Sequence, residues 1–228
     1  MSASPPRAHD LGRGDSLLSA RAKSAGRALL QPLVRLAVRL HVTPNTVTVI
    51  GFLIVVAASV LVAAGELLAG ALVLIAGSVL DAVDGALARA TGGTTPFGGF
   101  LDSTLDRAAE AVLYAGIGVY EISVASTPAF PVALAFVALT ASFLVSYARA
   151  RAEAAGYAAE IGVAPRMERL VIVIVGIGLA GLGFEVGIIG ALLLVATLAV
   201  ITTIQRIWHV HRQAAGSEPA GPQQHKGE

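Results

Sequence analysis

Residues 81–106 read DAVDGALARATGGTTPFGGFLDSTLD and place several carboxylates inside an otherwise apolar region. The aspartates are Asp81, Asp84, Asp102 and Asp106. The flanking stretches, GALVLIAGSVL at 70–80 and AAEAVLYAGIGVY at 108–120, are apolar enough to lie in lipid. A carboxylate near hydrocarbon is costly unless it is paired, hydrated or bound to a cation. Four of them at these spacings therefore predict a cation site.

The composition indicates a membrane protein with several helical spans. Hydrophobic residues make up 55% of the 228 residues and charged residues 14%, and the mean hydropathy is +0.75. A soluble domain of this size is less apolar, so we expect an all-α integral membrane fold. The chain has no cysteine, which excludes a disulfide or a thiolate metal site.

The sequence divides into four parts. Residues 1–15 are polar and predicted to be disordered, and residues 16–41 alternate apolar and basic positions as in an amphipathic helix of the headgroup layer. Residues 42–212 form the predicted six-helix domain, and residues 213–228 a disordered tail. The six apolar stretches are 46–64, 68–90, 98–120, 130–150, 167–184 and 187–208, each about the ~20 residues that a bilayer requires.

The distribution of charge predicts the orientation. The sixteen Lys and Arg residues fall in the N-terminal region, the second-to-third and fourth-to-fifth connections, the C-terminal end, or the helix ends that face them. The other three turns contain Glu66, Glu121 and Glu185 and no basic residue. By the positive-inside rule, both termini and the acidic segment face the cytoplasm, in a multi-pass protein of the cell membrane.

The spacing of the four aspartates favours convergence. Asp81 and Asp84 are three residues apart, and Asp102 and Asp106 four apart, so each pair shares a helix face. The short connection between them makes the two helices antiparallel neighbours. Carboxylate oxygens suit Mg²⁺ or Mn²⁺, and two such ions would leave coordination positions for phosphate oxygens.

Small residues and an arginine accompany the acidic cluster. Gly85, Ala88 and Gly98 allow close approach of a ligand or of a neighbouring helix. Arg89 lies one turn beyond Gly85 and could hold a phosphate in fork geometry. Glu110, one turn past Asp106, could support the site or only face the interior of the bundle.

The pattern D-x2-D-G-x2-A-R-x8-G-x3-D-x3-D is complete in this chain and resembles the motif of the CDP-alcohol phosphatidyltransferase family. The resemblance covers about residues 16–212. It implies that an acceptor alcohol displaces CMP from a CDP-linked lipid such as CDP-diacylglycerol, and that the enzyme is a homodimer in the bilayer. It further implies that the four aspartates hold two Mg²⁺ or Mn²⁺ ions, that Asp106 is also the general base, and that Gly85 and Arg89 contact the CDP group.

The stretch HVTPNTVTVIG at 41–51 extends the resemblance. Asn or Thr at such a helix start could simply cap exposed N–H groups. In the similar phosphatidylinositol-phosphate synthases, the matching positions contact the CDP-lipid. The positions that this resemblance assigns to CDP-lipid binding are Asn45, Thr46, Val47, Thr48 and Thr95.

Two further segments, SYARARAEAAG at 146–156 and GVAPRMERL at 162–170, bear on the acceptor. Their arginines are Arg149, Arg151, Arg166 and Arg169. Anchoring by the positive-inside rule would explain any one of them, but four together favour a pocket for a phosphorylated acceptor. The segments resemble those of phosphatidylinositol-phosphate and archaetidylinositol-phosphate synthases, which implies inositol 1-phosphate. Arg149 stands where Lys is common, and Pro165 where Glu is common.

Two other functions would use the same charged residues. Glycerol 3-phosphate also carries a phosphate and is the alternative acceptor, whereas serine or free inositol would not need the arginines. A cation transporter would use the aspartates as an ion path, but its site would normally lie near the bilayer midplane. The sequence indicates no nucleic-acid partner.

Overall fold

The computed structural model describes residues 31–92 and 95–216, and every regular element in these ranges is a helix. Residues 31–39 are helical and lead into the bundle. The bundle helices are α2 (Pro44–Ala63), α3 (Leu67–Thr91), α4 (Pro96–Val124), α5 (Ala129–Ala154), α6 (Arg166–Gly181) and α7 (Val186–Gly216). The six expected apolar helices are therefore all present.

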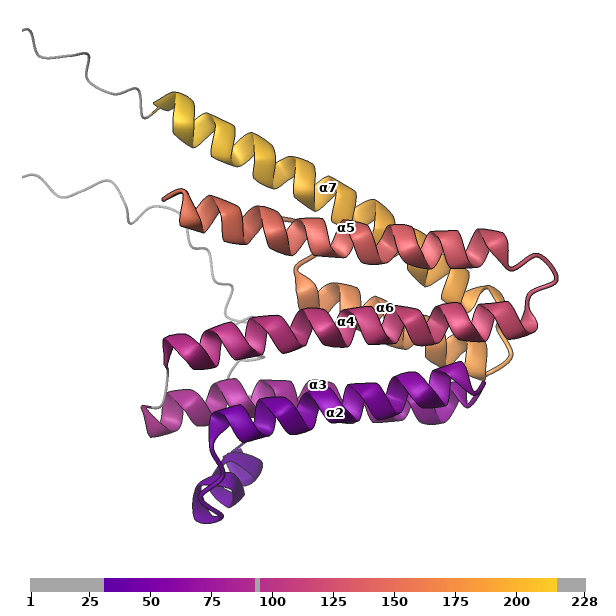
Figure 1. The fold of residues 1–228 in the computed structure, drawn as a ribbon, viewed down its shortest axis with the longest axis horizontal. Coiled ribbons are helices and arrows are strands. Elements are labelled where there is room, and N and C mark those ends of the chain that lie inside the picture. Colours follow the sequence, from indigo (N-terminus) through magenta and orange to yellow (C-terminus); the bar gives the residue numbers. More distant parts are fainter. Residues whose placement is uncertain (1–30, 93–94, 217–228) are drawn as a thin grey trace, which may run out of the picture.

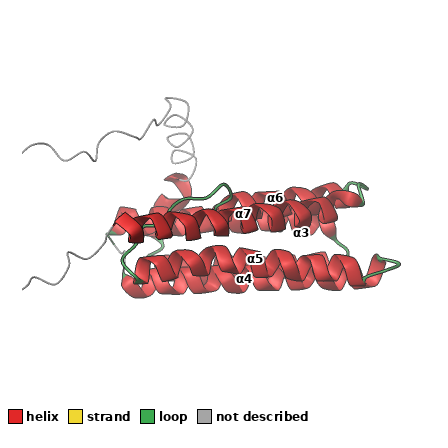
Figure 2. Cartoon of the chain, turned by 90° about the horizontal axis from the view of Figure 1, so that it is seen from above, coloured by secondary structure: helices red, strands yellow, loops and turns green. Residues whose placement is uncertain are grey.

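The six helices form a closed ring. Each packs mainly against two others, so that the order around the ring is α2, α3, α6, α7, α5, α4 and back to α2. Seen from above, α3, α6 and α7 lie in one layer and α4 and α5 in the other (Figure 2). The α3–α4 connection and the C-terminal ends of α5 and α7 lie at the same end of the molecule (Figure 1). The ring thus gathers at one end the segments that carry the acidic and basic motifs.

Local sequence signals start and stop the helices beside the acidic motif. Thr43 accepts a hydrogen bond from the Thr46 N–H and precedes Pro44, the first residue of α2. Thr95 does the same for the Gly98 N–H at the start of α4. A helix end is stabilised when a side-chain oxygen caps its free N–H groups, and proline suits the first position. Helix α3 ends at Thr91, and the φ of 63° at the following Gly92 is left-handed and favours glycine.

The interior of the ring is apolar and closely packed, and the outside is apolar too. Ala58, Leu74 and Ile117 are almost fully buried in the core. A Cβ on Gly116 would lie 2.6 Å from the Ser59 carbonyl oxygen, so this glycine lets α4 pack directly on the backbone of α2. Large apolar side chains such as Leu72 and Phe136 are each 67% exposed. An outer surface of this kind suits lipid instead of water.

Four of the helices, α2, α3, α5 and α7, are long and apolar enough to cross a membrane. Helix α6 has only 16 residues, about 24 Å at ~1.5 Å per residue. The first turns of α4 carry the charged residues of the motif. Of the six expected spans, four are thus supported by the length and composition of their helices.

The predicted ends of the chain lie mostly outside the described residues. Of the predicted amphipathic helix at 16–41, only residues 31–41 are described, and the predicted disordered segment at 1–15 is not. Helix α7 continues to Gly216, past the expected start of the tail at residue 213. The side-chain amide of Gln213 donates to the Ala158 carbonyl and accepts from its N–H, which explains why the helix continues there.

Candidate active site

Three of the four predicted aspartates form one cluster. Asp81 comes from α3, and Asp102 and Asp106 from α4; one oxygen of each lies within 4.8 Å of the others. Ligands of an octahedral ion with bonds of ~2.1 Å are about 3–4 Å apart, so small side-chain rotations would bring these oxygens onto one ion. A set of carboxylate oxygens without nitrogen or sulfur matches Mg²⁺ or Mn²⁺.

Asp84, the fourth aspartate, is held from a third helix. The Thr48 hydroxyl of α2 lies 2.9 Å from Asp84 Oδ2 and 3.1 Å from the Pro44 carbonyl oxygen. Asp84 is buried and lies outside the group formed by the other three. The structure therefore places Asp84 at the edge of the cluster, with its orientation set by the start of α2.

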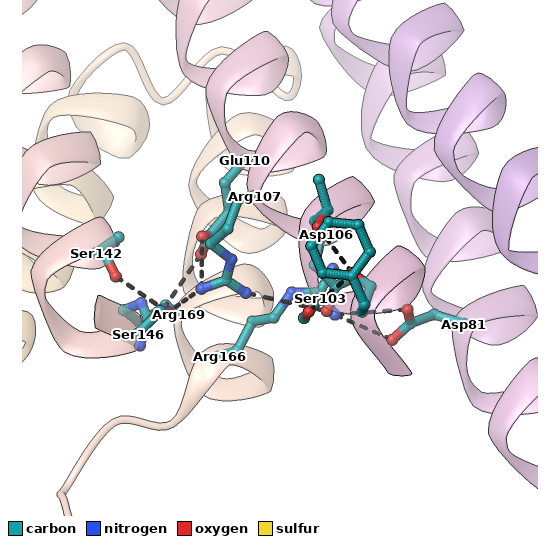
Figure 3. Close-up of polar contacts among 11 residues, drawn as sticks. Asp81, Ser103, Asp106, Arg107, Glu110, Ser142, Ser146, Arg166 and Arg169 are labelled. Atoms are coloured by element: carbon teal, nitrogen blue, oxygen red, sulfur yellow. Dashed lines mark hydrogen bonds and ion pairs between the residues drawn. The ribbon is translucent and has the colours of Figure 1, made fainter. Parts of the chain in front are cut away.

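Arg166, the first residue of α6, reaches into the acidic cluster (Figure 3). Its Nη1 lies 3.2 Å from Asp81 Oδ2, and its Nη2 lies 2.7 Å from Asp106 Oδ1. One guanidinium thus joins carboxylates of two different helices. The sequence predicted Arg166 as a phosphate ligand and gave no sign of this contact, because residues 81 and 166 meet only through the packing of α3 on α6.

A second charged network lies behind the cluster. Glu110 is paired with Arg169 through Oε1 at 3.2 Å and with Arg107 through Oε2 at 3.2 Å. Arg169 is 1% exposed and also donates to the Ala164 carbonyl oxygen. Arg107 donates to the Ser146 hydroxyl of α5 (Figure 3). Glu110 therefore supports the site, and Arg107 is a site residue that the sequence analysis missed although it directly follows Asp106.

The four predicted acceptor arginines do not all lie together. Arg166 and Arg169 face the interior, whereas Arg149 is on the surface and paired with Glu153 and Glu160. Arg151 is exposed.

A further arginine, which the sequence analysis did not name, lies close to this set. Arg206 of α7 is 6% exposed and donates to the carbonyl oxygens of Ile161 and Val145. Its position within the apolar sequence of α7 could have identified it, because a charged residue in such a segment is rare and usually functional.

The residues predicted for CDP-lipid binding surround the start of α2 and the α3–α4 connection. A Cβ on Gly98 would lie 3.1 Å from Asn45 Oδ1, so α2 and α4 begin close together. Thr46 and Thr95 belong to the helix caps. Val47 packs in a small apolar cluster and turns its side chain inward.

Gly85 and Arg89 lie on one face of α3. A Cβ on Gly85 would be 3.4 Å from Arg89 Nη1, so the guanidinium folds back over the glycine. Arg89 is exposed near the end of the helix. This arrangement brings a cation and a bare stretch of backbone together beside Asp81 and Asp84.

Two cavities adjoin at the site and share one wall. The first is lined by residues of α2, α3, α4 and α6, including Asp81, Asp84 and Asp106. The second is lined by Glu110, Tyr114 and Arg169 together with apolar residues. Arg166 lines both of them. Three aspartates thus line one cavity and the buried Arg169 lines the other, with Arg166 between them.

Comparison with known proteins gives a consistent result. The family model for CDP-alcohol phosphatidyltransferase matches residues 41–210. The chain is 34% identical over 192 residues to a phosphatidylinositol phosphate synthase of Corynebacterium glutamicum, covering 84% of this chain and 88% of that protein. It is 43% identical over 190 residues to an archaetidylinositol phosphate synthase of Pyrococcus horikoshii, covering 80% and 93%.

Solved structures agree with the sequence relatives. The phosphatidylinositol phosphate synthase of Mycobacterium tuberculosis with CDP-DAG bound superposes with a TM-score of 0.74 at 34% identity, covering 80% of this chain and 94% of that one. The same enzyme has been solved with manganese and citrate, also at a TM-score of 0.74 and 34% identity, with 80% and 88% covered. From the complete motif, the clustered aspartates and these matches, the chain belongs to the CDP-alcohol phosphatidyltransferase family.

Proposed function

We propose that this protein transfers a phosphatidyl-type group from CDP-diacylglycerol, or a related CDP-lipid, to inositol 1-phosphate and releases CMP. One observation carries the proposal: a cluster of three carboxylates adjoins a set of buried arginines, and Arg166 contacts the carboxylates while lining both cavities. A phosphorylated acceptor and a metal-bound diphosphate require these two environments side by side. Relatives named as inositol-phosphate-lipid synthases support the choice of acceptor.

On the donor side, Asp81, Asp84, Asp102 and Asp106 would hold two Mg²⁺ or Mn²⁺ ions. When bound, the ions neutralise the diphosphate and the departing CMP phosphate. Gly85 and Arg89 would contact the CDP group, because the bare backbone of Gly85 admits a phosphate and Arg89 supplies a planar cation. Asn45, Thr46, Thr48 and Thr95 would contact the CDP-lipid, and Val47 could do so only through its backbone.

On the acceptor side, Arg166 and Arg169 would bind the phosphate of inositol 1-phosphate, and Arg149 and Arg151, which lie at the surface, would attract it from solution. Asp106 would accept the proton of the attacking hydroxyl. The hydroxyl oxygen forms a bond to the lipid-bearing phosphorus, the bond from that phosphorus to the CMP oxygen breaks, and CMP leaves with the electron pair. Asp106 would thereby act both as a metal ligand and as the general base.

The same proposal includes the membrane arrangement. All six bundle helices would cross the cell membrane, and residues 16–41 would lie along its surface. Both termini and the acidic end of the bundle would face the cytoplasm, where the basic residues gather. The enzyme would be a homodimer.

The test is an acceptor screen with the purified full-length protein, CDP-diacylglycerol and Mg²⁺ or Mn²⁺. CMP release should depend on inositol 1-phosphate and should be far lower with glycerol 3-phosphate, serine or free inositol. Release that responds to glycerol 3-phosphate and not to inositol 1-phosphate would assign the other phosphorylated acceptor. Absence of CMP release with every acceptor would contradict the transferase function itself.

A further inference from the structure

The guanidinium of Arg166 contacts two of the three carboxylates that could share a metal ion. Nη1 lies 3.2 Å from Asp81 Oδ2 and 3.5 Å from Asp81 Oδ1, so both oxygens of this carboxylate face the cation. Nη2 lies 2.7 Å from Asp106 Oδ1. Asp81 and Asp106 are two of the three residues that can share an ion. A divalent ion and this guanidinium would therefore compete for the same two carboxylates, and their like charges repel each other.

Arg166 also borders a second cavity, toward which a displaced guanidinium would turn. Arg166 lines the acidic cavity and equally the second cavity, whose other polar residues are Glu110, Tyr114 and Arg169. The second cavity has a volume of about 30 Å³, so its lining would have to open as the Arg166 guanidinium turns into it. In the second cavity it would lie near Arg169, where the repulsion between two cations is relieved when a phosphate binds between them.

Buried N–H groups without hydrogen-bond acceptors are consistent with a second position for the Arg166 guanidinium. The Nε–H groups of Arg166 and Arg169 are buried and have no acceptor within residues 31–92 and 95–216. Arg169 is itself 1% exposed, so water reaches it poorly. Buried donors normally have partners, and a bound anion would supply them.

We propose that Arg166 and the divalent metal exchange places. Until the ion binds, the guanidinium neutralises Asp81 and Asp106. The ion displaces it into the second cavity, where it joins Arg169 in binding the acceptor's phosphate. This inference rests on the proposed function and adds a coupling to it: metal binding strengthens phosphate binding, and by linkage phosphate strengthens metal binding by the same factor.

The first experiment measures Mn²⁺ binding by electron paramagnetic resonance on the purified full-length protein, without CDP-lipid or acceptor. Arg166→Gln removes the competing cation, and its affinity for Mn²⁺ should rise at least about fivefold, the low end of typical coupling between sites. Arg166→Lys keeps the charge but cannot fork across two carboxylates, and should give an intermediate affinity. Arg212→Gln is the control, because it removes the same charge from an arginine that stacks on Trp208 and does not contact the carboxylates. The Mn²⁺ affinity of this variant should equal that of the wild type.

The second experiment measures the binding of inositol 1-phosphate by calorimetry, with and without saturating Mn²⁺. The wild type should bind inositol 1-phosphate at least about fivefold more tightly with Mn²⁺, and Arg166→Gln should lose this dependence. Equal or weaker Mn²⁺ binding in both Arg166 variants would overturn the exchange. The proposed function would survive that result if the wild type still binds Mn²⁺ and releases CMP, whereas failure of the wild type to bind Mn²⁺ would contradict the metal-dependent function itself.

Discussion

The acidic and basic halves of the site are built in different ways. The carboxylates of α3 and α4 belong to one helical hairpin, and their positions follow from spacings of three and four residues and one short connection. The arginines come from α4, α5, α6 and α7, and are held by contacts between residues far apart in the sequence. Arg166 bonds residues 81 and 106, and Arg206 bonds the carbonyls of residues 145 and 161. Local sequence thus determines the acidic half, whereas the packing of the ring determines the basic half.

The largest expected effect tests the acidic half. Asp106→Asn retains an oxygen ligand but removes the base, and should lower the rate of CMP release by roughly 10²–10⁴-fold, the usual contribution of general base catalysis. Mn²⁺ binding should be largely retained. The measurement is CMP release at saturating CDP-diacylglycerol and inositol 1-phosphate, together with Mn²⁺ affinity.

Glu121→Gln is the matched control for this variant. Glu121 is also a buried acid of α4, but it lies near the opposite end of the helix. Its substitution should leave the rate of CMP release within about twofold of the wild type, because Glu121 is too far from the motif to contact the reacting atoms. Unchanged turnover in Asp106→Asn would rule out the base role.

The second prediction tests the basic half. Arg169→Lys keeps a positive charge but cannot maintain both the bond to the Ala164 carbonyl and the pair with Glu110. We expect the KM for inositol 1-phosphate to rise by roughly 10–100-fold, because a lysine cannot replace the planar fork, while the KM for CDP-diacylglycerol changes little. Steady-state kinetics with each substrate varied in turn will measure this.

Arg212→Lys controls for the exchange of arginine for lysine at the same end of the bundle, and both KM values should be unchanged. If Arg169→Lys raised the KM values for the two substrates equally, the buried arginine would serve the stability of the whole site and not the acceptor. The comparison between the two halves would then lose its functional meaning.

The difference between the two halves explains which parts of the structure could be predicted from the sequence. The six helices and the convergence of three aspartates could be predicted, because periodicity and short connections are local properties. The separation of Arg149 from Arg169 could not be predicted. Two arginines in neighbouring segments can point to opposite sides of the structure, and the sequence does not show which side each one faces. Asp84 illustrates an intermediate case: its helix face was predicted, but its bond to Thr48 depends on how α2 packs against α3. Arg107 and Arg206 were missed because the sequence does not show what an arginine bonds to, even where its place beside a motif or within an apolar helix marks it as unusual.

A third, smaller effect tests whether the acidic half depends on α2. Thr48→Val preserves the shape of the side chain but removes the hydroxyl that lies 2.9 Å from Asp84. Groups that orient a metal ligand typically contribute 10–100-fold to metal affinity, and we expect the low end of this range, about tenfold, since Asp84 lies at the edge of the cluster. Mn²⁺ titration measures the loss, and Thr48→Ser should restore most of the affinity. Equal affinities for Val and Ser would show that Asp84 is held by its own helix alone.

The smallest effect concerns the glycine beside Arg89. A Cβ on Gly85 would lie 3.4 Å from Arg89 Nη1, so the guanidinium must shift by only a few tenths of an ångström. Alanine in a helix interior is favoured over glycine by about 1 kcal/mol, so Gly85→Ala should not lower the thermal unfolding midpoint. We nevertheless expect the KM for CDP-diacylglycerol to rise roughly two- to fivefold, because the added methyl group occupies space between the CDP phosphates and the backbone.

Gly99→Ala is the matched control for Gly85→Ala, since a Cβ there would meet nothing within 4 Å. It should leave the KM for CDP-diacylglycerol unchanged while receiving the same gain in helix propensity. A higher KM in Gly85→Ala with an unchanged or higher unfolding midpoint would separate the binding of the donor from the stability of α3. An unchanged KM would mean that Gly85 serves only the packing of Arg89, and that local sequence in the acidic half specifies less of the donor site than its complete motif suggests.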